Sequence, residues 1–101
     1  MRTTIQENEN QVIASFEGRL DTAAAVKTTI AIKPLLEVCN KEVILDCTNL
    51  DYISSSGLRI FLSIRKEAAA HGCKVIVRNI NPEVHQVFVM TGFSSLFEIQ
   101  G

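Results

Sequence analysis

The sequence predicts an α/β fold in which a β-hairpin is followed by alternating helices and strands, in the order ββαβαβαβ. Two short extended segments flank a polar break near the N-terminus, and later apolar runs typical of buried strands alternate with helix-forming segments. Strands that alternate with helices pair mostly in parallel through right-handed crossovers. We therefore expect a mixed, mostly parallel sheet with helices packed on it, formed by one domain over residues 1–101.

The hairpin is expected from residues 2–7 and 11–17, which lie on either side of Asn8-Glu9-Asn10. In the second segment Val12, Ala14 and Phe16 alternate with more polar neighbours, the period-two pattern of a strand with unequal faces. Gly18 is expected to end this strand.

A first helix is expected from Asp21 to about Glu37. The carboxylate of Asp21 can accept hydrogen bonds from the free N–H groups of a first helical turn, and the alanines that follow favour helix. Pro34 is expected to kink this helix or to start a new turn. Its apolar stripe is broad, because two rows share it: Val26, Ile30, Lys33 and Glu37, and Ile32, Leu35 and Leu36.

The central strand is expected at residues 42–47, a short apolar run bounded by charge and typical of a strand covered on both faces. Residues 48–53 are turn-like and lead into three serines. A second helix is expected from Ser55 or Ser56 to about His71, and Gly72 ends it.

The remaining elements are a strand at residues 74–78, a third helix that begins near Pro82, and a last strand at residues 96–99. Proline suits the first turn of a helix because its missing N–H would have no helical partner there. Thr91-Gly92 is expected to end the third helix.

Composition excludes several classes of function. The chain has 101 residues, of which 47% are hydrophobic and 21% charged, with a formal net charge of -1. No overall positive field is available to hold a nucleic acid backbone. No window approaches the ~18 apolar residues of a membrane span, and the N-terminus lacks the apolar core of a secretory signal. We expect a soluble, cytoplasmic protein.

The polar side chains do not indicate a catalytic centre or a metal site. Cys39, Cys47 and Cys73 have no metal-ligand spacing and are expected to be inert thiols. The histidines His71 and His85 are interpreted as surface residues. The aspartates have separate structural explanations: Asp21 as a cap, Asp46 at the end of a buried strand and Asp51 in a turn. At least one of them is expected to border the serines.

The turn Ser54-Ser55-Ser56-Gly57 is the most informative local feature. It follows a buried strand and begins a helix, and a helix N-terminus has unpaired N–H donors that favour negative charge. A phosphate there would add about -1.5 to -2 charge without melting the helix. Serine is also a good N-cap, so on these residues alone simple capping is the favoured explanation. The turn matches neither the G-x-S-x-G nucleophile elbow nor a glycine-rich phosphate-binding loop.

Several motifs together resemble the STAS domain family, specifically the bacterial anti-sigma factor antagonists. They are Gly18-Arg19-Leu20-Asp21, Val43-Ile44-Leu45-Asp46, Leu50 to Leu58 with its serine turn, Asn81-Pro82-Glu83-Val84 and Met90-Thr91-Gly92-Phe93. The resemblance runs nearly from end to end and implies a STAS-like fold. It also implies a regulatory protein rather than an enzyme, with no cofactor of its own.

The resemblance implies a partner switch. By this resemblance the unmodified protein is expected to bind an anti-sigma factor that is itself a serine kinase. This binding is expected to release a sigma factor from the anti-sigma factor. The kinase, which holds the ATP and magnesium, then phosphorylates the antagonist, and a PP2C-type phosphatase reverses this. The modified residue is expected to be Ser55, with Ser56 as the cap. The partner-binding residues are expected to be Asp21, Asp51, Ser54, Ser55, Ser56, Gly57, Leu58 and Arg59, with Leu58 or exposed helix residues as apolar contacts.

The sequence departs from the family pattern at two places. Ser54 stands where the family usually has Asp, so the turn lacks a carboxylate that could orient the acceptor hydroxyl. The chain stops after residues 97–99, where many relatives continue into a final helix, and either a monomer or a weak homodimer is expected.

Two other functions remain open from the sequence. One is a STAS module of another assembly, such as a lipid-transport subunit or another signalling regulator. The other is a small enzyme that holds a phosphorylated ligand at the same turn, since α/β folds often bind ligands at the C-terminal ends of their strands.

Overall fold

The computed structural model describes residues 1–37 and 40–100, so Cys39 lies outside the described residues. The predicted order of elements is confirmed, with two short 3-10 helices added. Their bounds are β1 Arg2–Glu7, β2 Gln11–Leu20, α1 Thr22–Ala31, η1 Lys33–Glu37, β3 Glu42–Ile53, α2 Ser55–Ala70, β4 Val75–Arg78, α3 Pro82–Met90, η2 Phe93–Ser95 and β5 Glu98–Gln100. The strands form a five-stranded sheet in the order β1-β2-β3-β4-β5. The first pair is antiparallel and the others are parallel, which confirms the mixed sheet.

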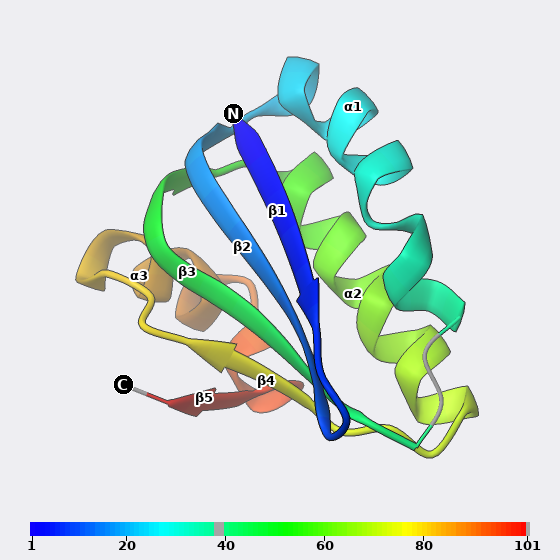
Figure 1. Cartoon of the computed structure of the whole chain (residues 1–101). Coiled ribbons are helices and arrows are strands. Elements are labelled where there is room, and N and C mark those ends of the chain that lie inside the picture. The colour runs from blue at the N-terminus through cyan, green and yellow to red at the C-terminus, as the bar shows by residue number, and fades with distance from the viewer. Residues whose placement is uncertain (38–39, 101) are drawn as a thin grey trace.

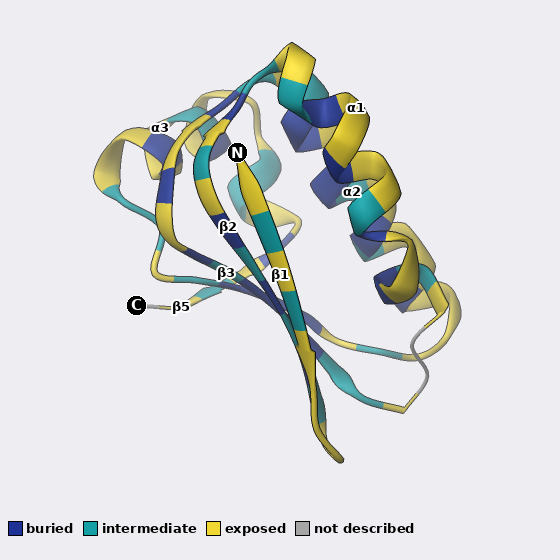
Figure 2. Cartoon of the chain, turned by 45° about the horizontal axis from the view of Figure 1, so that its top comes forward, coloured by how far each residue is buried: buried dark blue, intermediate teal, exposed yellow. Residues whose placement is uncertain are grey.

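The helices α1, α2 and α3 lie on the same face of the sheet (Figure 1). Each crossover leads to the next strand in the same direction, and right-handed crossovers repeated in one direction place every helix on one side. The core lies between this face and the helices, whose inner sides are buried (Figure 2). It contains Phe16, Phe61, Phe88 and Phe97, and the contacting pairs of rings have centroids 5.1 to 6.5 Å apart.

The helices of the described residues all lie over one face of the sheet (Figure 1), and the central strand is nevertheless buried on both faces, as predicted. Val43 and Leu45 belong to the core under the helices, and Ile44 between them therefore points to the opposite face. Ile44 is still only 2% exposed, and its parallel neighbour Ile76 is 3% exposed.

The central strand is longer than expected, because β3 continues through residues 48–53, which were predicted to be a turn. These residues pair with the second half of β2, where Gly18 lies opposite Leu50 and Leu20 opposite Ile53. Leu50 and Ile53 are buried. The pairing therefore outweighs the local turn preference, and both Asp46 and Asp51 lie within the strand rather than at its end or in a turn.

β2 also runs further than expected, since it passes through Gly18 to Leu20. Gly18 has a φ of +100° and lies at an irregularity in the pairing with β3. The positive φ explains why glycine stands there, but this residue bends the strand rather than ending it.

The first helix ends earlier than expected, at Ala31, and residues Lys33–Glu37 form the 3-10 helix η1. Pro34 has no N–H to donate to the carbonyl of Ile30 four residues earlier, so α1 cannot continue through it and the chain starts a new turn. The last strand begins at Glu98, two residues later than predicted, because η2 precedes it.

Candidate functional site

The serine turn, residues Ser54–Gly57, joins the end of β3 to the start of α2. Ser54 has extended backbone, and its Oγ accepts a hydrogen bond from the Gly57 N–H at 3.2 Å. The Ser54 N–H donates to the Leu20 carbonyl at the end of β2, at 2.9 Å. Because Asp21 and α1 follow Leu20 directly, this hydrogen bond places the starts of the two helices beside each other.

The N-cap of α2 is Ser54, so the prediction that Ser56 is the cap is wrong. A cap needs extended backbone just outside the helix, whereas Ser55 and Ser56 already lie inside α2. Within the residues that the structure describes, neither of their hydroxyls has a hydrogen-bond partner. Ser55 is exposed and Ser56 half-buried. Ser55 is therefore the most accessible hydroxyl of the turn.

Gly57 allows the first turn of α2 to lie close to the strand ends. A Cβ atom at this position would lie 2.7 Å from Cγ of Leu20 and 2.8 Å from Cγ1 of Ile53. Both neighbours are buried side chains. Leu58 is also buried, at 3% exposed. Gly57 and Leu58 thus position the turn from inside the core and do not contribute apolar surface to it.

The predicted aspartates Asp21 and Asp51 both lie near the turn. Asp21 caps α1, with Oδ1 accepting from the Ala24 N–H at 2.8 Å, as predicted. Asp51 is exposed near the end of β3. Next to it the guanidinium of Arg19 lies over the ring of Tyr52, 4.3 Å from the centroid, a cation–π contact between β2 and β3.

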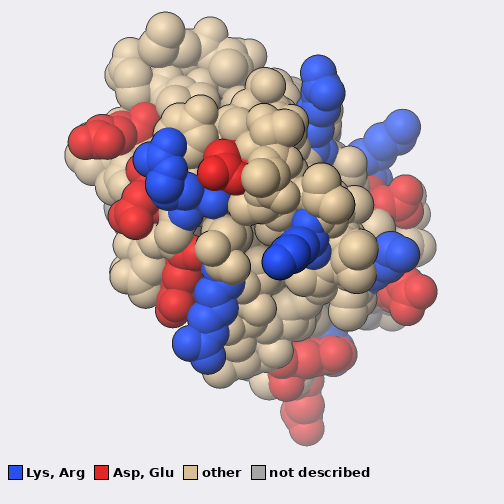
Figure 3. Space-filling view, turned by 90° about the horizontal axis from the view of Figure 1, so that it is seen from above, with Lys and Arg blue, Asp and Glu red and all other residues tan. Residues whose placement is uncertain are grey.

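Two depressions flank the serine turn. One is a groove of about 470 Å³ between α1 with η1 and α2, and its lining includes Ser56 and Arg59. The other is a cleft of about 220 Å³ between the end of β3 and α3, and its lining includes Asp51 and Glu83. Figure 3 looks onto the end of the molecule where α1 and α2 begin, and side chains of both charge signs are spread over it.

The groove was not predicted from the sequence. Its lining residues from α1 and η1, among them Val26 and Lys33, were assigned to the buried stripe of the first helix. Val26 and Ile30 are instead 67% and 62% exposed, while Ile32 and Leu35 of the other row are buried. A stripe too broad for one buried face was the available signal that part of it lies on the surface.

The described residues contain no cluster of side chains that could hold a metal ion. No group of three or more His, Cys, Asp or Glu side chains lies close enough to hold a metal within residues 1–37 and 40–100. His71 and His85 are exposed, as predicted. Cys47 is fully buried, and burial, with a smaller effect of the Asp46 charge, raises the pKa of its thiol so that it stays protonated.

Asp46 has a structural role on the helix-free face. Burial raises the pKa of its carboxyl group, but hydrogen bonds from Thr48 and the positive charge of Arg78 lower it by more, and the resulting pKa is below the usual value. Thr48 Oγ1 donates to Asp46 Oδ1 at 2.5 Å, and Arg78 Nη2 lies 3.6 Å from Oδ2. These contacts join β3 to β4 away from the serine turn.

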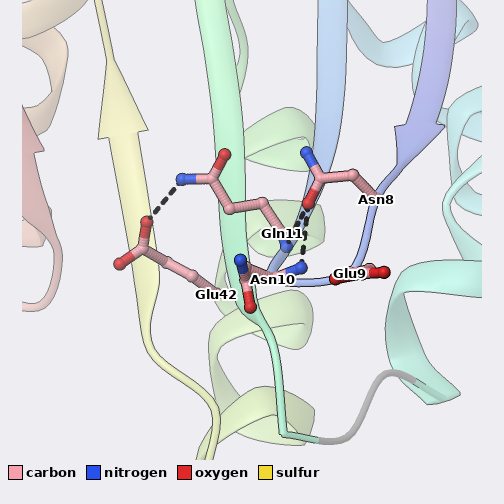
Figure 4. A pocket seen from close by; sticks show the side chains of 5 residues that line it. All are labelled: Asn8, Glu9, Asn10, Gln11 and Glu42. Carbon is pink, nitrogen blue, oxygen red and sulfur yellow. Dashed lines mark hydrogen bonds between the residues drawn. The ribbon is translucent and has the colours of Figure 1, made fainter.

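A further hollow lies at the hairpin turn between β1 and β2 (Figure 4). Asn8 Oδ1 accepts from the backbone N–H groups of Asn10 and Gln11, at 2.9 and 2.8 Å. Gln11 Nε2 donates to Glu42 Oε1 at 2.9 Å. These polar groups stabilise the hairpin and its contact with β3, and the hollow is a consequence of that turn.

The helices of the described residues are all too short or too polar to cross a membrane.

Comparison with known proteins gives one consistent result. A protein-family model described as the STAS domain matches residues 2–101. BtrV of Bordetella bronchiseptica, provisionally named an anti-sigma factor antagonist, is 29% identical over 98% of this chain and 85% of its own length. The anti-sigma-B factor antagonist of Bacillus subtilis is 24% identical over 94% of this chain and 86% of its own. Both relatives are thus named as anti-sigma factor antagonists, the group that the motifs of the sequence resemble.

Solved structures show the same fold. A protein of Thermotoga maritima, provisionally described as an anti-sigma factor antagonist, has a TM-score of 0.87 at 19% identity, over 98% of this chain and 86% of that one. The anti-sigma factor antagonist SpoIIAA in its unphosphorylated form has a TM-score of 0.80 at 21% identity, over 97% of this chain and 87% of SpoIIAA. Bacillus SpoIIAA in its phosphorylated form has a TM-score of 0.73 at 20% identity, over 97% of this chain and 90% of SpoIIAA.

Proposed function

The chain belongs to the STAS domain family, and we propose that it is an anti-sigma factor antagonist controlled by phosphorylation of Ser55. In the proposed cycle the unphosphorylated chain binds an anti-sigma factor that is itself a serine kinase, and a sigma factor is released. The kinase then transfers the γ-phosphoryl group of ATP to Ser55 Oγ: the new O–P bond forms as the bond to the β-phosphate oxygen breaks, ADP leaves, and the hydroxyl proton passes to a base of the kinase or to water. A PP2C-type phosphatase hydrolyses the phosphoserine and restores the binding form.

The accessibility of the Ser55 hydroxyl is the observation that carries this proposal. Ser54 is used in capping α2 and Ser56 is half-buried, whereas Ser55 is exposed and has no hydrogen-bond partner within the described residues. A kinase can reach this hydroxyl without unfolding the turn. The two forms of SpoIIAA, unphosphorylated and phosphorylated, support the idea because this fold accommodates the modification in that protein.

Phosphate at Ser55 would act as a change of surface charge. The helix N-terminus favours a negative group, so we expect α2 to remain folded. The carboxylates of Asp21 and Asp51 already lie near the turn, and a phosphate would add about -1.5 to -2 charge to this face. A partner docked over an uncharged serine would then meet a solvated anion, which weakens binding.

The test is a phosphorylation assay with the full chain, Mg-ATP and each candidate serine kinase encoded in the same genome. Mass spectrometry locates the phosphate. We expect label on Ser55 in the wild type and in Ser56→Ala, and its loss in Ser55→Ala. Thr22→Ala is the matched control, because Thr22 is an exposed hydroxyl at the first position of α1, as Ser55 is in α2.

Binding to the same kinase provides the second measurement. We expect Ser55→Asp to weaken binding by about tenfold or more, equivalent to about 1.4 kcal/mol. Ser95→Asp, which makes the same change at an exposed serine of η2, is expected to bind as the wild type does. Phosphate on Ser56 or Thr22 instead of Ser55, or unchanged binding by Ser55→Asp, would contradict the proposal.

A further inference from the structure

The groove between α1 with η1 and α2 begins at the serine turn. Its volume is about 470 Å³, and its lining includes the apolar residues Val26, Ile32, Leu36 and Ile60. Ser56 and Arg59, from the first two turns of α2, line its end nearest the turn. The groove is therefore continuous with the surface at which Ser55 lies.

The α1 side of the groove presents apolar side chains to solvent. Val26 is 67% exposed, and Ile30, one turn further along α1, is 62% exposed. Single exposed aliphatic residues are common on protein surfaces. Here, however, the two are neighbours on one helix, and Val26 itself lines a concave apolar groove, a combination typical of an interaction site.

The charged residues that line the groove are cations. They are Lys33 and Arg59, and no carboxylate lines the groove among the residues that the structure describes. Neither side chain forms an ion pair within residues 1–37 and 40–100. On the other side of the serine turn the cleft beside α3 has the opposite sign, because its charged lining residues are Asp51 and Glu83.

We propose that this groove binds a segment of the partner protein that combines apolar side chains with carboxylates, the latter pairing with Lys33 and Arg59. The apolar lining supplies contact area, and the cations select the sign of the partner's charge. Since the other depression is acidic, such a segment fits one side of the turn only, and this fixes the orientation of the partner. That the partner is the kinase rests on the function proposed above.

The same geometry links the groove to the serine switch. Ser55 and Arg59 are four residues apart on α2 and both exposed, and such positions have Cβ atoms about 5–6 Å apart. A phosphate on Ser55 would pair with Arg59 and add negative charge at the mouth of the groove. An acidic segment would lose one of its two cationic partners and be repelled.

The experiment uses the full ¹⁵N-labelled chain and two synthetic amphipathic helical peptides. The peptides share the same leucines, and one carries glutamates where the other carries lysines. We expect the acidic peptide to change the amide chemical shifts of Val26, Lys33 and Arg59 until the groove is saturated. The affinity from this titration is expected to be about tenfold higher than that of the basic peptide. We expect Ser55→Asp to weaken the acidic peptide severalfold and Ser95→Asp to leave it unchanged.

Charge reversal provides the matched control. Lys33→Glu combined with Arg59→Glu is expected to reverse the preference between the peptides. Lys27→Glu makes the same kind of change on α1 but lines a different hollow, beside Met1 and Thr3, and is expected to retain the wild-type preference. Thermal unfolding of each variant shows whether it is folded.

The outcomes separate this proposal from the proposed function. Equal binding of both peptides, shifts confined to other surfaces, or the same loss with Lys27→Glu would overturn the groove assignment even if Ser55 is phosphorylated. Selective binding of the acidic peptide in the groove would support it even if no kinase labels Ser55, in which case the proposed function alone fails.

Discussion

The helices α1 and α2 begin side by side and by the same plan, but different forces hold their starts. Each has an N-cap side chain followed by an exposed hydroxyl, Asp21 with Thr22 in α1 and Ser54 with Ser55 in α2. The cap of α1 is a carboxylate with a hydrogen bond of 2.8 Å, and that of α2 is a neutral hydroxyl with a bond of 3.2 Å. Electrostatic interactions with the cap thus stabilise the start of α1 more than the start of α2.

The third helical position explains how α2 is held with the weaker cap. In α1 this position is the half-buried Ala24, whereas in α2 it is the buried Gly57, which leaves no room for a Cβ beside Leu20 and Ile53. Close packing of the helix on the strand ends therefore substitutes for a charged cap. The start of α2 therefore does not depend on the hydroxyl of the exposed Ser55 that follows the cap.

Of the substitutions at the two helix starts, Gly57→Ala is expected to change the free energy of unfolding most. The new methyl group would lie under 3 Å from Leu20 and Ile53, both buried, so the neighbours or the helix must move. Overpacking of this kind costs about 1–3 kcal/mol, more than the ~1 kcal/mol that alanine gains over glycine in a helix. We expect a net loss of stability in urea unfolding and reduced phosphorylation of Ser55.

Ser63→Ala is the control for this change. Ser63 is exposed on the same helix, so removal of its hydroxyl should change the free energy of unfolding by no more than about 0.5 kcal/mol. If Gly57→Ala were as stable as Ser63→Ala, the packing of α2 on the strand ends would not be what holds its start.

A smaller effect is expected when each cap is removed. Asp21→Ala should lower the free energy of unfolding by about 1 kcal/mol, because a helix loses a hydrogen bond and a favourable charge at its N-terminus. Ser54→Ala should cost less, about 0.5 kcal/mol, because its hydrogen bond is neutral and longer. Chemical unfolding at low ionic strength compares the two variants, and a larger loss for Ser54→Ala would reverse the comparison.

Much of this arrangement was predictable from the sequence, because local chemistry determines it. The carboxylate of Asp21 and the Asn81-Pro82 pair start helices by capping, and Gly72 and Gly92 have the positive φ that a helix end requires. Such signals depend on a few adjacent residues. The position of the serine turn followed from the same reasoning.

The errors arose where distant pairing decides the structure. Residues 48–53 have turn-like side chains, but pairing with the far end of β2 keeps them in β3. Three consecutive serines offer three possible caps, and only the backbone register of the strand identifies Ser54. The groove escaped prediction because the apolar Val26 and Ile30 were assigned to the buried stripe although their row also contains Lys33 and Glu37. Which of two apolar rows is buried depends on how α1 is rotated against the sheet.

The smallest effect is expected from Ser54→Asp, which gives α2 the charged cap of α1. Aspartate and serine cap about equally well, so the gain comes from the interaction of a negative charge with the helix N-terminus, about 0.3–1 kcal/mol at low ionic strength. The matched control is Ser54→Asn, which has the same shape and no charge. We expect Ser54→Asp to raise the melting temperature above that of Ser54→Asn, and the difference to disappear at ~1 M salt, where the screening length is only about 3 Å. Equal melting temperatures at low salt would mean that the neutral cap of α2 is not a weakness, and that the two helix starts differ in packing alone.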